Sequence, residues 1–132
     1  MEIPLDIKKI KMVIGDCTSG GSSDNVWFKI KQWQTHEESK ECETNKLGYF
    51  DSGDILEWSG KNLTQCNKLQ FDGDNPHLYF WILADSGDDF CVSSVEIKLD
   101  NEENTTFYKT IAEENKWYDE DTNGRRHTAT KT

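Results

Sequence analysis

The sequence predicts an all-β protein, an antiparallel β-sandwich of about eight strands. Short apolar or alternating segments recur along the 132 residues, clusters of Gly, Asp, Asn and Ser separate them, and no stretch has a convincing helical period. Short strands at regular spacing, with turns between them, are typical of a sandwich. The length suits a single domain that buries its own core.

The clearest strand is predicted at residues 25–33, where apolar and polar side chains alternate with a period of two. The alternation places Val26, Phe28 and Ile30 on one face, which we expect to be buried. A first strand is predicted at residues 8–15, and a loop rich in Gly, Ser and Thr joins the two. That loop is too long for a two-residue hairpin turn.

The middle of the chain predicts shorter elements. Residues 34–46 are polar throughout and predict a loop at the sheet edge, held by Cys42. Residues 47–51 form a short segment, and strands are expected at residues 54–58 and 63–71.

Two longer strands are predicted in the second half. Residues 77–84 are nearly all apolar, which predicts a central strand covered on both faces. Residues 90–99 predict the next strand, in which a β-bulge near Ser93 and Ser94 keeps the apolar side chains in phase. The candidate core residues of this strand are Val92, Val95, Ile97 and Leu99.

The end of the chain is increasingly polar. Weak strands are predicted at residues 105–111 and 116–118. We therefore expect the sandwich domain to span residues 1–118 and residues 119–132 to be a polar, flexible tail.

The five tryptophans divide into two groups. Trp58, Trp81 and Trp117 fall in strand patterns and are predicted to be core residues. Trp27 and Trp33 lie opposite the apolar face of their strand, so they are candidates for binding a partner, although they can equally cover the outer face of the sheet.

The net charge of −10 restricts the partners. It argues against nucleic acid, whose phosphates require Lys and Arg, and against a purely electrostatic attachment to anionic lipid. Calcium that bridges protein carboxylates and lipid phosphates removes the second objection. The alternative is that the acidity only solvates the surface.

The cysteines predict two disulfides. They are even in number, widely spaced and without a CxxC pair: Cys17, Cys42, Cys66 and Cys91. Cys42 with Cys66 is the preferred pair and Cys17 with Cys91 the other, although four cysteines allow three connectivities.

Two glycosylation sequons begin at Asn62 and Asn104. Sequons and paired cysteines together predict a secreted, extracellular glycoprotein.

A family resemblance rests on four blocks. Residues 10–30 contain a strand that ends at Gly-Asp, a Gly-rich loop, an Asp and a second strand; residues 81–98 contain a strand, an acidic loop and a Val-Glu-Ile strand. Residues 50–54 and 106–117 add a Phe-x-x-Gly segment and a closing Tyr-and-Trp segment. In order and spacing, these blocks resemble PLAT (lipoxygenase-homology) domains. The resemblance implies a β-sandwich that interacts with lipid or with another protein.

The resemblance also implies a calcium site. Asp24 and Asp85 align with the acidic residues of the two loops, Asp88 is the next carboxylate, and Ser19 and Gly21 offer backbone carbonyls. Calcium takes six to eight oxygen ligands from flexible loops of this kind. The alternative is that Ser, Gly and Asp simply form good turns.

Two further patterns are interpreted as uninformative about function. Residues 119–124 match the first half of an EF-hand loop, but Thr130 stands where the bidentate Glu belongs, so the match is attributed to chance. The three histidines lie in no catalytic motif, so we expect no enzyme.

The sequence therefore predicts a secreted, non-enzymatic binding module that uses calcium to dock on a lipid surface or on an extracellular protein. One alternative is a calcium-dependent lectin whose Trp stacks on a glycan. Another is an accessory or toxin-like subunit that binds another chain.

Overall fold

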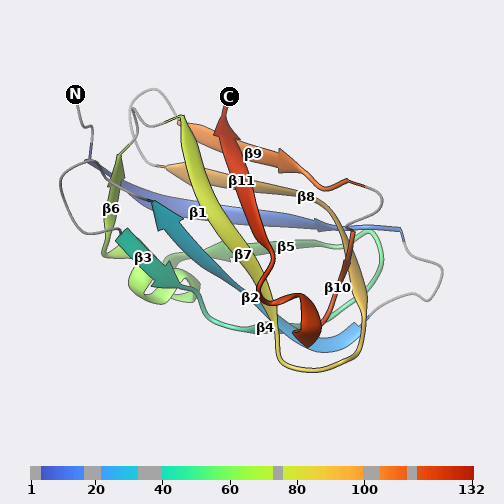
Figure 1. Cartoon of the computed structure of the whole chain (residues 1–132). Helices are drawn as coiled ribbons and strands as arrows, with labels where there is room; N and C mark the ends of the chain where they lie inside the picture. The colour runs from blue at the N-terminus through green and yellow to red at the C-terminus, as the bar shows by residue number, and fades with distance from the viewer. Residues whose placement is uncertain (1–3, 17–21, 33–39, 73–75, 100–104, 113–115) are drawn as a thin grey trace.

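The computed structural model describes residues 4–16, 22–32, 40–72, 76–99, 105–112 and 116–132 (Figure 1). Nearly all regular structure in these residues is β-strand, and all strand pairs are antiparallel, which confirms the predicted fold class. The strands are β1 (Pro4–Ile14), β2 (Ser22–Gln32), β3 (Lys40–Glu43), β4 (Leu47–Phe50), β5 (Ile55–Ser59), β6 (Gln70–Asp72), β7 (His77–Ala84), β8 (Phe90–Leu99), β9 (Thr106–Thr110), β10 (Trp117–Tyr118) and β11 (Arg126–Lys131).

The strands form one curled sheet in the order β3-β2-β7-β11-β9-β8-β1-β5. Strand β4 pairs with β2, β6 with β1, and β10 with β8. The curl brings the two halves of the sheet face to face, as in a sandwich: the rings of Phe28 on β2 and Trp58 on β5 meet edge to face, 4.9 Å between centroids. No helix in the described part of the chain is long and apolar enough to span a membrane.

The core follows the predicted alternation. Val26, Phe28 and Ile30 are fully buried, as are the apolar residues expected from residues 90–99. The predicted bulge is confirmed, because Val13 faces Ser94 whereas the next residue, Ile14, faces Val92.

The prediction of a flexible tail at residues 119–132 is wrong. Strand β11 lies inside the sheet between β7 and β9, and its inward side chains, His127 and Ala129, are buried. The sequence does not predict this strand because Ala129 is its one apolar residue, and because neither of its partner strands, β7 and β9, is its neighbour in the sequence.

Two predictions for the middle of the chain are also wrong. A 3₁₀-helix, η1 (Gly60–Asn67), occupies the start of the stretch expected as a strand at 63–71. Its buried residues, Leu63 and Cys66, are three apart, which is the period of a 3₁₀-helix. Residues 34–46 were expected as a loop, but they include β3, which pairs with β2.

The burial of the tryptophans differs from the prediction. Trp58 is fully buried, as expected, but Trp117 is 40% exposed. Trp81 is half-buried on the outer face of β7, so that strand is central but not covered by protein layers on both faces. Basic side chains cover its outer aromatics instead: Lys29 Nζ lies 4.2 Å from the Trp81 ring centroid, and the Arg126 guanidinium 4.8 Å from that of Tyr79.

Candidate functional site

An acidic pair lies at the end of the sheet where β2 begins and β7 ends, the lower end in Figure 1. Strands β2 and β7 are paired with Val26 opposite Ala84, so Asp24 and Asp85 are brought together across 61 positions of sequence. The backbone N–H of Asp85 donates to Asp24 Oδ1 at 3.2 Å. The two carboxylates that the family resemblance selected as calcium ligands are therefore neighbours.

Polar contacts hold Asp85 in place. Asn25 donates to it twice, from its backbone N to Oδ1 at 3.4 Å and from its side-chain Nδ2 to Oδ2 at 3.1 Å. Lys46 Nζ lies 3.4 Å from the same Oδ2. Hydrogen bonding by Asn25, and secondarily by Asp24, lowers the pKa of Asp85.

Asp24 has the opposite electrostatic environment. Its side chain is 1% exposed, and this burial, followed by the hydrogen bond with Asp85, raises the pKa of Asp24. Ionised Asp24 therefore carries a desolvated negative charge beside a second carboxylate. A cation bound between the two groups relieves this unfavourable energy.

The other predicted ligands do not join the pair in the described structure. Asp88 is exposed. Its charge acts on the next residue, Asp89: a hydrogen bond with Asp119, burial, and the charges of Asp119, Asp88 and Asp121 raise the pKa of Asp89. Within the described ranges, no three Asp, Glu, His or Cys side chains are grouped to hold a metal. Ser19 and Gly21 lie outside the described residues.

The segment that resembles an EF-hand serves a structural role. Asp119 and Thr122 form a capping box around the short 3₁₀-helix η3 (Glu120–Thr122). Asn123 bonds the backbone of Ala84 through both side-chain atoms, Oδ1 and Nδ2, each at 2.8 Å. These bonds tie the segment to the end of β7, next to Asp85.

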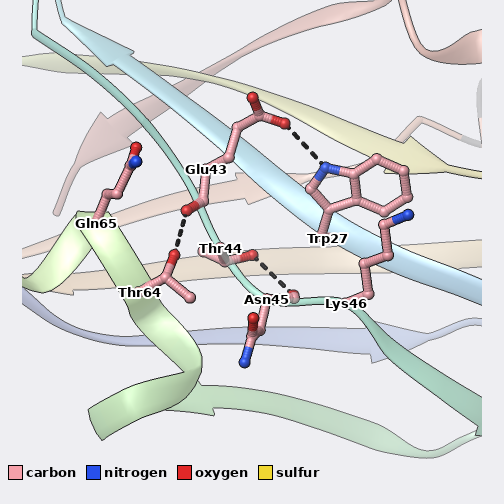
Figure 2. Close-up of a pocket in the computed structure, with 7 residues that line it drawn as sticks. All are labelled: Trp27, Glu43, Thr44, Asn45, Lys46, Thr64 and Gln65. Carbon is pink, nitrogen blue, oxygen red and sulfur yellow. Dashed lines mark hydrogen bonds between the residues drawn. The ribbon is translucent and has the colours of Figure 1, made fainter.

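A groove, drawn in Figure 2, is connected to the acidic pair through Lys46, which contacts Asp85. Its volume is about 730 Å³, and it is lined by Trp27, Glu43, Thr44, Asn45, Lys46, Thr64 and Gln65. Trp27, a predicted partner-binding residue, is half-buried there; its Nε1 donates to Glu43 Oε1 at 3.0 Å, and Lys46 Nζ lies 4.5 Å from its ring centroid. The other predicted partner-binding residue, Trp33, lies outside the described residues.

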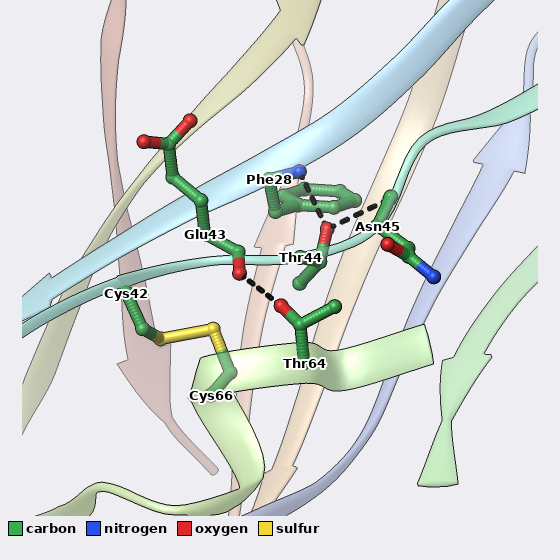
Figure 3. The surroundings of a disulfide bond; sticks show 7 residues. All are labelled: Phe28, Cys42, Glu43, Thr44, Asn45, Thr64 and Cys66. Carbon is green, nitrogen blue, oxygen red and sulfur yellow. Dashed lines mark hydrogen bonds between the residues drawn. A yellow bond between two sulfur atoms is a disulfide. The ribbon is translucent and has the colours of Figure 1, made fainter. Parts of the chain in front are cut away.

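The predicted disulfide between Cys42 and Cys66 is confirmed, and it lies next in sequence to the groove residues Glu43 and Gln65 (Figure 3). It joins β3 to η1 and so connects the two sides of the groove. Cys91 is buried and is not a free thiol. Its predicted partner, Cys17, lies outside the described residues.

Thr64 adds backbone strain to the groove. Its φ of 49° and ψ of −117° are unusual for a β-branched residue, and its Oγ1 donates to the carbonyl of Glu43. Thr64 also completes the sequon of Asn62, which is partly exposed on η1. Asn104, in the second sequon, lies outside the described residues.

Tyr49 was not identified from the sequence. It is 89% exposed, and its φ is 58°. The preceding residue, Gly48, faces Asn25 across β4 and β2, so the backbone of Tyr49 follows directly after the residue paired with the neighbour of Asp24. Nothing in the local sequence distinguishes an exposed aromatic with left-handed backbone from an ordinary strand residue.

Comparison of the chain with protein-family models and with curated protein sequences gave no match. The resemblance to PLAT domains therefore stays a prediction.

Proposed function

We propose that this protein is a secreted, non-enzymatic binding module that takes up calcium at the acidic pair and docks that end on a lipid surface. The observation that supports the proposal is the juxtaposition of Asp24 and Asp85 at one end of the sheet. Secretion is supported by the Cys42–Cys66 disulfide, which is typical of oxidising compartments.

The chemistry of the pair suits a hard cation. Carboxylate oxygens are the ligands that calcium prefers, and a divalent cation neutralises the buried charge of Asp24. To bind it, Asp85 must exchange Lys46 for the cation. Two carboxylates supply only part of the coordination that calcium needs, and lipid phosphate oxygens and water are suitable for the remainder.

Tyr49 supports docking on a lipid surface. A tyrosine has an apolar ring and a polar hydroxyl, which suits the boundary between membrane and water. The net charge of −10 repels anionic lipid, so attachment by this end requires the cation.

Calcium uptake is tested by thermal unfolding in excess calcium, in magnesium and in EDTA. Calcium at about a hundred times its dissociation constant stabilises by roughly 2.7 kcal/mol. We expect a calcium-specific rise in Tm that is lost in Asp24→Asn and kept in Asp6→Asn, a matched change on β1. An equal rise in both variants would place the cation elsewhere.

Docking is tested by sedimentation with vesicles of phosphatidylcholine and phosphatidylserine. We expect binding in calcium but not in EDTA, weakened by Tyr49→Ala and unchanged by Tyr108→Ala, a change at another exposed tyrosine. Calcium uptake without vesicle binding would favour a protein partner. The alternative functions, a calcium-dependent lectin and a subunit of a protein complex, stay predictions, as does the absence of enzymatic activity.

A further inference from the structure

We propose that the groove beside Trp27 is a binding site for a neutral saccharide, and that it works without calcium. The inference is independent of the proposed function, because the groove and the acidic pair share only the contact between Lys46 and Asp85.

The groove is built as a fixed site. The segment after β3 leaves the regular ladder: Thr44 N donates to Phe28 O at 3.0 Å, and Phe28 N donates to Thr44 Oγ1 at 3.0 Å. A side-chain oxygen thus replaces a backbone carbonyl at the position next to Trp27 (Figure 3). Such interruptions of pairing re-aim neighbouring side chains and are common beside binding sites.

The next residue, Asn45, is held from two directions. Its carbonyl accepts from Trp58 Nε1 at 2.8 Å, and its backbone N donates to Asn62 O at 2.9 Å. These bonds fasten the segment to the core and to η1. A site held in this way binds with little loss of conformational entropy.

The opposite side of the groove is equally constrained. Thr64 keeps a strained backbone conformation that is unusual for a β-branched residue. Its hydroxyl bonds to Glu43 O, and the Cys42–Cys66 disulfide lies two residues away. Strain of this kind persists where the surrounding structure enforces it, and it concentrates at ligand-binding sites.

The lining side chains indicate the class of ligand. Glu43 and Lys46 contribute one charge of each sign, so the lining has no net charge and a neutral ligand is favoured. Asn45 and Gln65 are exposed, and their side-chain amides both donate and accept hydrogen bonds. Sugar hydroxyls also both donate and accept, so they match these amides.

Trp27 supplies the apolar contact. One face of a pyranose ring presents C–H groups, which pack on an aromatic ring. Lys46 now lies over the Trp27 ring, and Figure 2 shows its side chain running beside the indole. The sugar takes this place when Lys46 moves aside, and in the absence of calcium Asp85 stays available as the ionic partner of Lys46.

The size agrees with this assignment. The groove volume of about 730 Å³ lies within the range of small-molecule sites, which is about 300–1,000 Å³. This volume is large enough for a mono- or disaccharide.

The test follows the indole Nε1–H resonance of Trp27 in isotopically labelled whole chain, in EDTA and again in calcium. The probes are glucose, galactose, mannose, N-acetylglucosamine and their β1–4-linked disaccharides. Inorganic phosphate and tetramethylammonium serve as anionic and cationic probes. We expect a saturable shift with at least one sugar, both in EDTA and in calcium.

Variants separate the groove from the rest of the surface. Calorimetric titration with the same sugars measures the variants, because it does not depend on the indole resonance. Trp27→Ala and Gln65→Ala should each weaken sugar binding by roughly tenfold or more. Trp117→Ala and Lys68→Ala are the matched controls, at an exposed Trp on β10 and just after η1, and should bind normally. Gln65 is exposed, so its replacement keeps the test valid if Trp27→Ala unfolds.

Three results would overturn the inference: no response to any sugar, sugar binding that survives both groove variants, or a response to the charged probes alone. Sugar binding that requires calcium would assign the glycan to the acidic pair instead. Failure of calcium uptake leaves the inference intact, because the expected binding persists in EDTA.

Discussion

The groove beside Trp27 and the acidic pair are neighbours in the fold, but they are held in opposite ways. A disulfide, a strained Thr64 and bonds to buried Trp58 hold the groove. In the acidic pair, a buried carboxylate lies against a second carboxylate, and exposed Lys46 is the basic partner that the described structure shows for Asp85. The groove is therefore held by its own contacts, whereas the proposed function requires a cation to stabilise the acidic pair.

The largest effect is expected from removing the disulfide. The bond spans 24 positions, and a loop of this size contributes about 3 kcal/mol. The Cys42→Ser/Cys66→Ser variant should lose about that much free energy of unfolding in urea denaturation. If the two regions are held independently, its calcium-induced rise in Tm remains. Loss of that rise would show that the disulfide also supports the acidic pair.

The next largest effect is a loss of stability at low pH that comes from buried His127. It has to be distinguished from the pH dependence that Asp24 contributes. His127 Nε2 lies 2.9 Å from Tyr118 Oη, and the ring stacks on Phe80. Burial, assisted by the charges of Arg125 and Lys109, lowers the pKa of His127 from 6.5 to about 4. Because the folded pKa is the lower one, this stabilisation is complete above pH 6.5 and is lost as the pH falls towards 4.

The expected loss between these pH values is about 2 kcal/mol, after allowance for partial solvent screening. Urea denaturation at pH 7 and pH 4 measures it, and His127→Gln should flatten the dependence on pH. Asp24 has the opposite effect on stability. Because its pKa is raised in the folded protein, its protonation at lower pH stabilises the fold. A wild-type stability that rises steadily from pH 7 to pH 4 would contradict the role assigned to His127.

A smaller effect is expected from variants of Thr64, which report the backbone strain in the groove. Thr64→Ala removes the hydrogen bond to Glu43 and keeps a Cβ at positive φ, so it should cost about 1 kcal/mol. Thr64→Gly loses the same bond but relieves the strain, so its free energy of unfolding should stay near that of wild type. Equal stability of the two variants would mean that the groove stores no strain.

The smallest effect is expected for Asp24→Asn in EDTA, and its reversal in calcium distinguishes the acidic pair most directly. Asp24→Asn keeps an oxygen that can accept from Asp85 N and removes the buried charge. In EDTA at pH 7 it should lose no stability and gain slightly, whereas in calcium it should fall below wild type. Chemical denaturation under both conditions measures the crossover. A clear loss in EDTA would show that ionised Asp24 stabilises the fold without a cation.

Local patterns predicted the parts of the fold that depend on periodicity. The alternation of Val26, Phe28 and Ile30, the apolar stretch of β7 and the bulge in β8 are all readable within about ten residues. The same is true of Trp58 as a core residue. The alternation of apolar and polar side chains along a strand is a local property, so the amino-acid sequence is sufficient to predict it.

Elements that depend on distant partners could not be predicted. β11 is polar on its outer face and becomes a strand only because β7 and β9 leave room between them. Trp117 matches a core pattern, but its short strand pairs with β8 alone and leaves the ring 40% exposed. In both cases the environment, and not the residue type, decides the outcome.

The candidate sites show the same division. Residue types and the family resemblance selected Asp24, Asp85 and Trp27. The bond between Cys42 and Cys66 was the preferred pairing, but the sequence left three connectivities open, and the structure decided this bond. Tertiary structure alone decided that Lys46 contacts both Asp85 and Trp27, that Thr64 faces Glu43, and that Asp24 is buried. The physical reason is that charge, burial and strain depend on contacts between side chains that are distant in the sequence. The pairing of β-strands determines these contacts, as it does for Asp24 and Asp85, which are 61 positions apart.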